Sequence, residues 1–140
     1  MNIKITLEDE LNDAENYTLN SLIKAIADMF AVSKEDLIGK NRMAYIVTPR
    51  HVLYYMGYTY THHTLTTLAN FLDRDHTTVL YGVDKIRSQK LSNKAMAMKI
   101  EEVHMLALAY EEKRQNGLEQ IREEVQDMVE RIQMEKIRGL

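Results

Sequence analysis

A run of polar residues in the middle of the chain has the side chains best suited to recognise another molecule. Arg74 is followed by Asp75, His76, Thr77 and Thr78, and the apolar positions begin directly afterwards. At the start of a helix, Asp, His and Thr side chains can hydrogen-bond to base edges in the major groove of DNA, and Thr methyls can contact thymine methyls. The free amides of a helix N-terminus also favour phosphate. The alternative is that Asp75 and Thr78 only cap the helix.

Two short helices are expected to present this run. Thr64 can cap a helix carrying apolar residues to Leu72, and Asp75 can cap a second helix. The expected buried side of that second helix consists of Val79, Leu80, Val83 and Ile86. A pair of helices separated by three or four polar residues is the pattern of a helix-turn-helix.

The preceding residues predict further helices. Apolar residues recur every three or four positions from Leu19 to Phe30, which indicates one face of a helix. Ser33 begins a capping-box-like segment that ends at Gly39. Residues 40–47 are interpreted as a loop. Thr48–Pro49 is interpreted as the N-cap and first position of the next helix.

The C-terminal third predicts two long helices. Ser92 is expected to cap the first, which continues to about Gln115, and Asn116–Gly117 is expected to end it. The second helix carries apolar residues at alternating spacings of three and four, which we call the C-terminal seam. The C-terminal seam consists of Leu118, Ile121, Val125, Met128 and Ile132. This heptad pattern permits a homodimer or contact with a partner protein, and the alternative is that the seam folds back on the domain's own core.

Composition bounds the class of protein. The 140 residues include no cysteine and one proline, and the charge of −3 is unevenly divided. Residues 1–16 form an acidic tail, residues 17–90 are net basic, and residues 91–140 form an acidic helical extension. A polyanion would therefore bind the middle segment. No 18-residue uncharged apolar run or signal peptide is visible, so no membrane contact and a cytoplasmic location are expected. We expect an all-α protein.

Motifs for catalysis are missing. Gly39–Lys40 is followed by Asn41 and lacks the upstream glycine of a phosphate-binding loop, so no bound nucleotide is expected. His62, His63 and His76 have no acid or His at a ligating helical spacing, which favours surface histidines over a metal site. Adjacent glutamates alternate with Lys and Arg, as on solvated helices. We expect neither an enzyme nor a cofactor.

The string FLDRDHTTVLYGVDKI, residues 71–86, resembles the C-terminal DNA-binding domain of the bacterial replication initiator DnaA. Its R-D-H-T-T-V run and downstream K-I match that family's hallmark, and the resemblance covers residues 17–90. The resemblance implies that Asp75, His76 and Thr77 reach base edges, with Thr78 on base or phosphate. It further implies DNA contacts for the remaining polar positions of the match, with Arg42 toward the minor groove and Lys40 and Lys85 on phosphates. These positions are Lys40, Arg42, Arg50, His51, Arg74 and Lys85.

The sequence departs from the family pattern at positions that would lie near DNA, and these departures bear on its binding. The basic loop has one arginine, Arg42, where the family usually has several, and Leu72–Asp73 replaces the usual glycines. Weaker binding or a shifted target is expected from these differences. The sequence also lacks a counterpart of the family's ATPase domain. The resemblance implies sequence-specific binding of double-stranded DNA in replication or transcription control; the alternative is a helical adaptor that recruits a replication partner such as a helicase.

Overall fold

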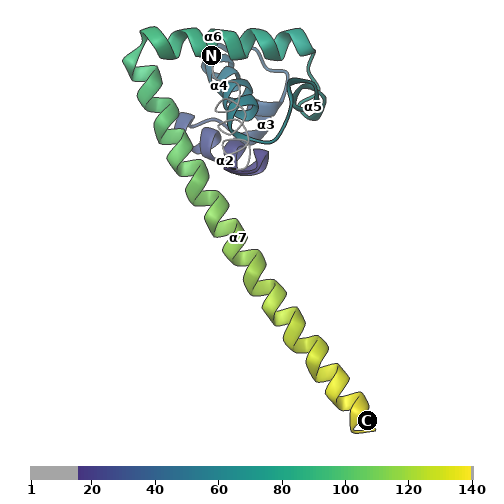
Figure 1. The fold of residues 1–140 in the computed structure, drawn as a ribbon. Coiled ribbons are helices and arrows are strands. Elements are labelled where there is room, and N and C mark those ends of the chain that lie inside the picture. Colours follow the sequence, from purple (N-terminus) through teal and green to yellow (C-terminus); the bar gives the residue numbers. More distant parts are fainter. Residues whose placement is uncertain (1–15, 140) are drawn as a thin grey trace, which may run out of the picture.

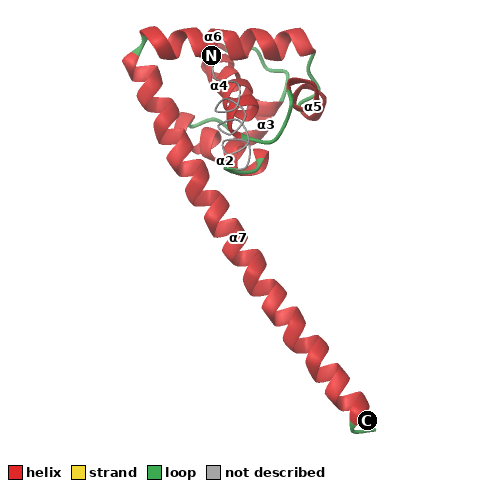
Figure 2. Ribbon diagram, viewed as in Figure 1, coloured by secondary structure: helices red, strands yellow, loops and turns green. Residues whose placement is uncertain are grey.

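The computed structural model describes residues 16–139, and these residues form six helices and no strand (Figures 1 and 2). The helices are α2 (Leu19–Phe30), α3 (Lys34–Ile38), α4 (Ala44–Tyr60), α5 (Leu65–Phe71), α6 (His76–Ser92) and α7 (Lys94–Ile137). The predicted all-α class is therefore confirmed. The predicted acidic tail lies outside the described residues, apart from Asn16. None of the described helices has the length and apolar character that crossing a bilayer requires.

The hydrophobic core lies where α2, α4 and α6 meet the first half of α7. The predicted apolar face of α2 is confirmed, since Leu22 and Ile26 are fully buried. Both ends of α2 are capped: Thr18 accepts a hydrogen bond from the Ser21 amide, and Ala31, in a left-handed conformation with φ 55°, donates its amide to the Ala27 carbonyl.

The start of α4 differs from the prediction. We expected the helix to begin at Pro49, but it begins at Ala44, and Pro49 lies inside it. Pro49 removes one backbone donor from the helix, and the turn that precedes it brings Ile46 into the core, where Ile46 is fully buried. The expected loop is consequently limited to residues 39–43, which contain Lys40 and Arg42.

Helices α5 and α6 form the predicted helix-turn-helix. The side chain of Thr64 caps α5 by accepting from the Thr67 amide, and residues 72–75 connect the two helices. Val79, Val83 and Ile86 of α6 are buried as predicted, whereas Leu80 is exposed and the prediction for it was wrong. Leu80 directly follows a buried position, so it falls outside the stripe at spacings of three and four that faces the core.

The C-terminal region is one helix rather than two. Helix α6 continues through Ser92, and Asn93 is the residue that caps α7 by accepting from the Met96 amide. Gly117 does not end α7, because a helix-ending glycine takes a left-handed conformation and in the described chain only Gly139 does so among the glycines. Gly117 lies in the helix interior, and good helix formers nearby, such as Gln115, Leu118 and Glu119, override its unfavourable propensity of about 1 kcal/mol.

The distal part of α7 extends away from the folded core (Figure 1). All side chains from residue 112 to residue 139 are exposed, and so is the whole C-terminal seam. The interpretation that the seam folds back on the domain's own core was therefore wrong for the described chain.

Candidate nucleic-acid interface

The first turn of α6 presents the polar residues to solvent. Asp75 is the N-cap residue of α6, and His76, Thr77 and Thr78 form the first turn. All four residues are exposed. The Asp75 side chain makes no capping hydrogen bond, so its carboxylate is not used to satisfy the helix end. The alternative that Asp75 serves only as a cap is therefore not supported.

Arg74 fixes the position of this turn. Its Nε donates to the Tyr54 hydroxyl at 3.0 Å, and its Nη1 donates to the carbonyls of Leu72 and Asp73 at 3.2 and 3.3 Å. Its Nη2 donates to the carbonyls of Ile38, at 3.1 Å, and Gly39. These bonds use the five N–H donors of the guanidinium within the protein. Arg74 therefore positions the turn through hydrogen bonds within the protein.

Arg50 has a similar internal role. Its Nε donates to the Leu37 carbonyl at 2.9 Å and its Nη2 to the Asp36 carbonyl at 2.6 Å. Arg50 is buried, and burial lowers the pKa of its guanidinium, with nearby Arg74 adding to the effect. We expected Arg50 to lie against the DNA backbone or the groove edge. In the structure its side chain is buried, and it donates to C-terminal carbonyls of α3, which have no partner within that helix.

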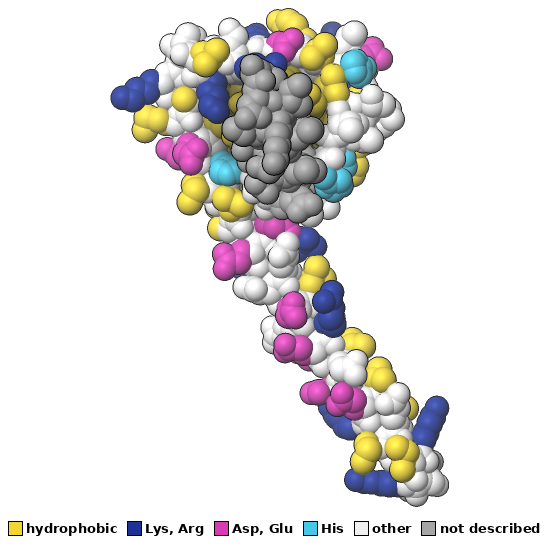
Figure 3. Space-filling model, viewed as in Figure 1, with side chains coloured by type: hydrophobic (Ala, Val, Ile, Leu, Met, Phe, Trp, Pro, Cys, Tyr) yellow, Lys and Arg dark blue, Asp and Glu magenta, His cyan; other side chains and the backbone are white. Residues whose placement is uncertain are grey.

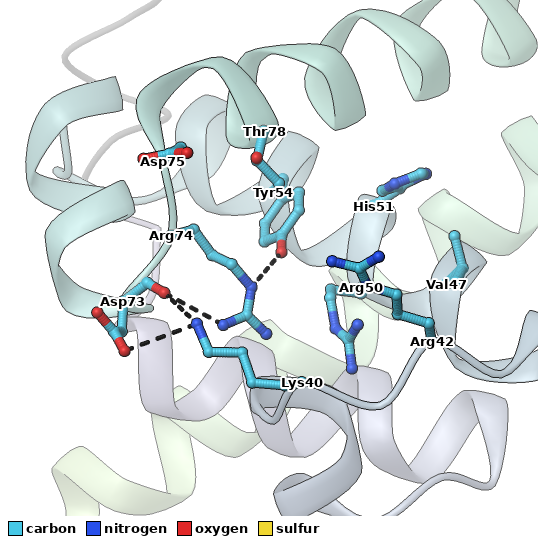
Figure 4. A pocket seen from close by; sticks show the side chains of 10 residues that line it. All are labelled: Lys40, Arg42, Val47, Arg50, His51, Tyr54, Asp73, Arg74, Asp75 and Thr78. Carbon is cyan, nitrogen blue, oxygen red and sulfur yellow. Dashed lines mark hydrogen bonds and ion pairs between the residues drawn. The ribbon is translucent and has the colours of Figure 1, made fainter.

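A polar hollow of about 460 Å³ lies beside the turn (Figure 4). Its walls come from the 39–43 loop, from α4, and from the turn that leads into α6. The hollow brings together most of the predicted site residues, with His76, Thr77 and Lys85 outside its lining. The lining residues are Lys40, Arg42, Val47, Arg50, His51, Tyr54, Asp73, Arg74, Asp75 and Thr78.

The 39–43 loop carries two cationic side chains, Lys40 and Arg42, which differ in their contacts. Lys40 is exposed, and its ammonium donates to the Asp73 carbonyl at 2.7 Å and lies 3.6 Å from the Asp73 carboxylate. Arg42 is exposed at the edge of the hollow. Lys40 therefore connects the loop to the helix-turn-helix, and both side chains are accessible to an anionic partner.

His51 lies between α4 and α6. Its ring centroid is 6.1 Å from that of Tyr54 and 5.8 Å from that of Tyr81. Burial lowers the pKa of His51, and the charges of Lys85 and Arg50 lower it further, which favours the neutral form of the ring. A neutral imidazole can still donate one hydrogen bond to a phosphate. Lys85 itself is exposed on α6.

Sequence reasoning missed three residues that shape the site. Tyr54 receives the Arg74 hydrogen bond, and a Cβ on Gly82 would lie 2.6 Å from the Tyr54 ring, so Gly82 permits the close approach of α4 and α6. Asp73 has φ 52°, a conformation where glycine is favoured and Asp is tolerated. For Asp73 the sequence held a signal, because residues 72–73 replace glycines that are usual in the family. Among the described residues no group of three or more His, Cys, Asp or Glu is arranged to hold a metal.

The fold and this site define a helix-turn-helix domain with an exposed polar first turn on its second helix. Residues 19–86 match the family model described as the bacterial DnaA protein helix-turn-helix, so this domain resembles the helix-turn-helix of that family, as the sequence indicated. The chain is 41% identical over 85 residues, 60% of its length, to the chromosomal replication initiator protein DnaA of Oenococcus oeni. It is 34% identical over 97 residues, 69% of its length, to that of Xanthobacter autotrophicus. In both cases the match spans 19% of the relative.

Proposed function

We propose that this protein binds double-stranded DNA sequence-specifically, with the first turn of α6 in the major groove. The observation that carries this proposal is the exposed run of Asp75, His76 and Thr77 at the N-terminus of α6, held in place by Arg74 and flanked by exposed cations. An exposed polar turn of this kind has no role in the protein's own packing. Its amides and side chains are suited to phosphates and base edges.

The structure supports a division of roles among the candidate residues. Asp75, His76 and Thr77 contact base edges, and Thr78 contacts a base or phosphate. Arg42 reaches toward the minor groove, and Lys40, His51 and Lys85 contact the DNA backbone. Arg50 and Arg74 act through the protein, because their donors hold α3 and the turn.

The relatives are named as replication initiators, which supports a role for this chain in the initiation or regulation of DNA replication, at sites resembling the DnaA box. Control of transcription by the same contacts is the other role that such binding would serve. Both roles need the same DNA interface.

Selection of bound duplexes from a random library, at stated salt, tests the proposal. Fluorescence anisotropy on a selected site should then show that His76→Ala and Thr77→Ala each weaken binding by about 1–3 kcal/mol and relax specificity at one position. Gln120→Ala, on the exposed distal part of α7, is the matched control and should bind as the wild type does. Equal affinity of all four proteins would contradict the assignment.

A second candidate function is a helical adaptor that recruits a replication partner such as a helicase. The observation that favours it is the exposed apolar seam on α7, which lies outside the helix-turn-helix. A library selection that returns no enriched duplex, together with binding of a purified replicative helicase that Val125→Glu abolishes, would support this function over the first.

A further inference from the structure

Apolar side chains gather along the distal part of α7, interleaved with acidic and basic ones (Figure 3). The five residues of the C-terminal seam are between 46% and 57% exposed. Gly117 lies immediately before the seam, and helices in proteins gain most of their stability from the packing of an amphipathic face. A continuous helix with one apolar stripe and no packing partner in its own described chain indicates a surface that another helix covers.

We propose that the C-terminal seam pairs with the seam of a second copy of this chain in an antiparallel two-stranded coiled coil. The seam has a heptad pattern in which Leu118, Val125 and Ile132 occupy a positions, and Ile121 and Met128 occupy d positions. Identical stripes cover each other in a twofold symmetric dimer. This pairing needs no DNA and does not depend on the proposed function.

The position of the folded core excludes a parallel pair. Ala107 and Glu111 are buried where α7 packs on α2, and Glu111 precedes Leu118 and Val125 by one and two heptads. The seam therefore continues the same face of α7 that is turned toward α2. In a parallel pair, the part of the partner's α7 that precedes its seam would lie beside the same part of the first α7. It would enter the space that α2 occupies.

The length of α7 fits the antiparallel pair. In the register that places Val125 opposite Met128 of the partner subunit, Ile121 lies opposite Ile132 of the partner subunit. These four residues form the paired part of the seam, and Leu118 lies at its edge, opposite Glu135 of the partner subunit. Each helix then ends, at Ile137, about opposite Asn116 of the partner subunit. The partner helix therefore stops five residues before Glu111, which accepts a hydrogen bond from Ser21 of α2.

The flanking charges favour the same orientation. Residues at e and g positions lie beside the core of a coiled coil and set its orientation. In the antiparallel register Glu124 faces Arg131 of the partner subunit, and the twofold axis repeats the pair. In a parallel pair Arg131 would instead face Lys136 of the partner subunit, which is repulsive. The seams together would bury on the order of 1,000 Å², the low end of specific interfaces, so we expect a dimer of micromolar affinity.

Sedimentation equilibrium of the full chain across micromolar concentrations tests the pairing. We expect a monomer–dimer equilibrium that Val125→Glu abolishes, because the substitution puts a charge in the seam. Gln126→Glu adds the same charge at the next, outward-facing position and should leave the dimer intact. Circular dichroism should show that both variants remain folded. A wild-type chain that stays monomeric throughout, or a dimer that Val125→Glu leaves intact, would overturn the proposal.

Charge reversal tests the orientation. Arg131→Glu should raise the dimer dissociation constant about tenfold in the antiparallel pair, since it places two glutamates opposite each other at each end. The double variant Glu124→Arg, Arg131→Glu should restore it. In a parallel pair Arg131→Glu would instead tighten the dimer by facing Lys136 of the partner subunit, and that result would overturn the proposal. Binding of Val125→Glu to a single selected DNA site is measured separately. Failure of the DNA-binding proposal can thereby be distinguished from failure of the dimer proposal.

Discussion

Arg50 and Arg74 donate hydrogen bonds to four consecutive backbone carbonyls at the C-terminal end of α3. Arg50 donates to the carbonyls of Asp36 and Leu37, and Arg74 donates to those of Ile38 and Gly39. The last carbonyls of a helix have no hydrogen-bond donor within the helix, and they carry the negative end of the helix dipole. The two guanidinium groups supply both the donors and the positive charge. This arrangement joins α3 to α4 and to the turn before α6, and thereby sets where the polar first turn points.

Arg74→Lys should destabilise the protein by about 2–3 kcal/mol, because a single ammonium cannot serve the five acceptors of the guanidinium. Urea unfolding measures the loss. Arg87→Lys is the matched control, since Arg87 is exposed on α6 and its hydrogen bond goes to the exposed Asp84. The control should change stability by less than about 0.5 kcal/mol. Equal stability of the two variants would show that the Arg74 network contributes little.

Asp73→Asn should strengthen DNA binding about two- to fivefold at low salt without changing stability much. The substitution removes a negative charge that is almost fully exposed next to the proposed DNA surface. Asn tolerates the left-handed backbone as Asp does, and Lys40 keeps its hydrogen bond to the carbonyl of residue 73. Anisotropy titrations at several salt concentrations measure the gain, which should shrink as salt rises.

Asp127→Asn on the distal part of α7 is the control, and it removes the same charge far from the helix-turn-helix. If both variants change DNA affinity equally, the effect reflects net charge, and the predicted location of the DNA surface is wrong.

Gly82→Ala should destabilise the protein by about 1–2 kcal/mol, although alanine is the better helix former. A Cβ at this position would lie 2.6 Å from the buried Tyr54 ring and 3.0 Å from the His51 ring, and neither ring atom is at a flexible end. Gly117→Ala is the control, because a Cβ there would meet no atom within 4 Å and the helix is exposed at this point. It should stabilise the protein by about 0.5–1 kcal/mol. Thermal unfolding measures the change in stability of each variant, which should be a loss for Gly82→Ala and a gain for Gly117→Ala. A change in the same direction for both variants would contradict the packing argument.

The parts of the fold that follow local patterns were predictable. The spacing of Leu22 and Ile26 indicated the buried face of α2, and the polar run before Val79 indicated the exposed start of α6. The helix boundaries at Pro49 and Gly117 were not predictable in this way. In both places tertiary packing or strong neighbouring helix formers outweigh a local cost of one hydrogen bond or about 1 kcal/mol.

The arginines of the site show a second limit of local patterns. Arg50 and Arg74 lie in a net-basic segment beside a polar helix start, so their types alone indicate contacts with DNA. In the structure both arginines donate to backbone carbonyls of residues 36–39, which lie 13 to 36 residues away in the chain. Every residue has a backbone carbonyl, so no residue type marks these partners, and the pairing depends on how α3 and α4 pack.

The stability of the protein should fall as the pH drops from about 4.5 toward 2, because of Glu111 on α7. Burial alone would raise the pKa of Glu111, but hydrogen bonds from Arg114, Thr18 and Ser21 outweigh burial and lower the pKa to about 2. A carboxylate with a lowered pKa stabilises the folded state above its unfolded pKa, and that contribution is lost as the folded form becomes protonated. The lowered pKa corresponds to about 2–3 kcal/mol at pH 7.

Glu111→Gln should therefore lose about 2–3 kcal/mol at pH 7, and its difference from the wild type should shrink as the pH approaches 2. The variant keeps the size of the side chain but cannot hold the Arg114 ion pair, whose closest atoms are 2.6 Å apart. Urea unfolding at pH 7, 4 and 3 measures this convergence. Glu112→Gln, at the exposed neighbouring position, should follow the wild type at each pH. A constant difference between Glu111→Gln and the wild type would mean that the carboxylate charge does not hold α7 against the N-terminus of α2.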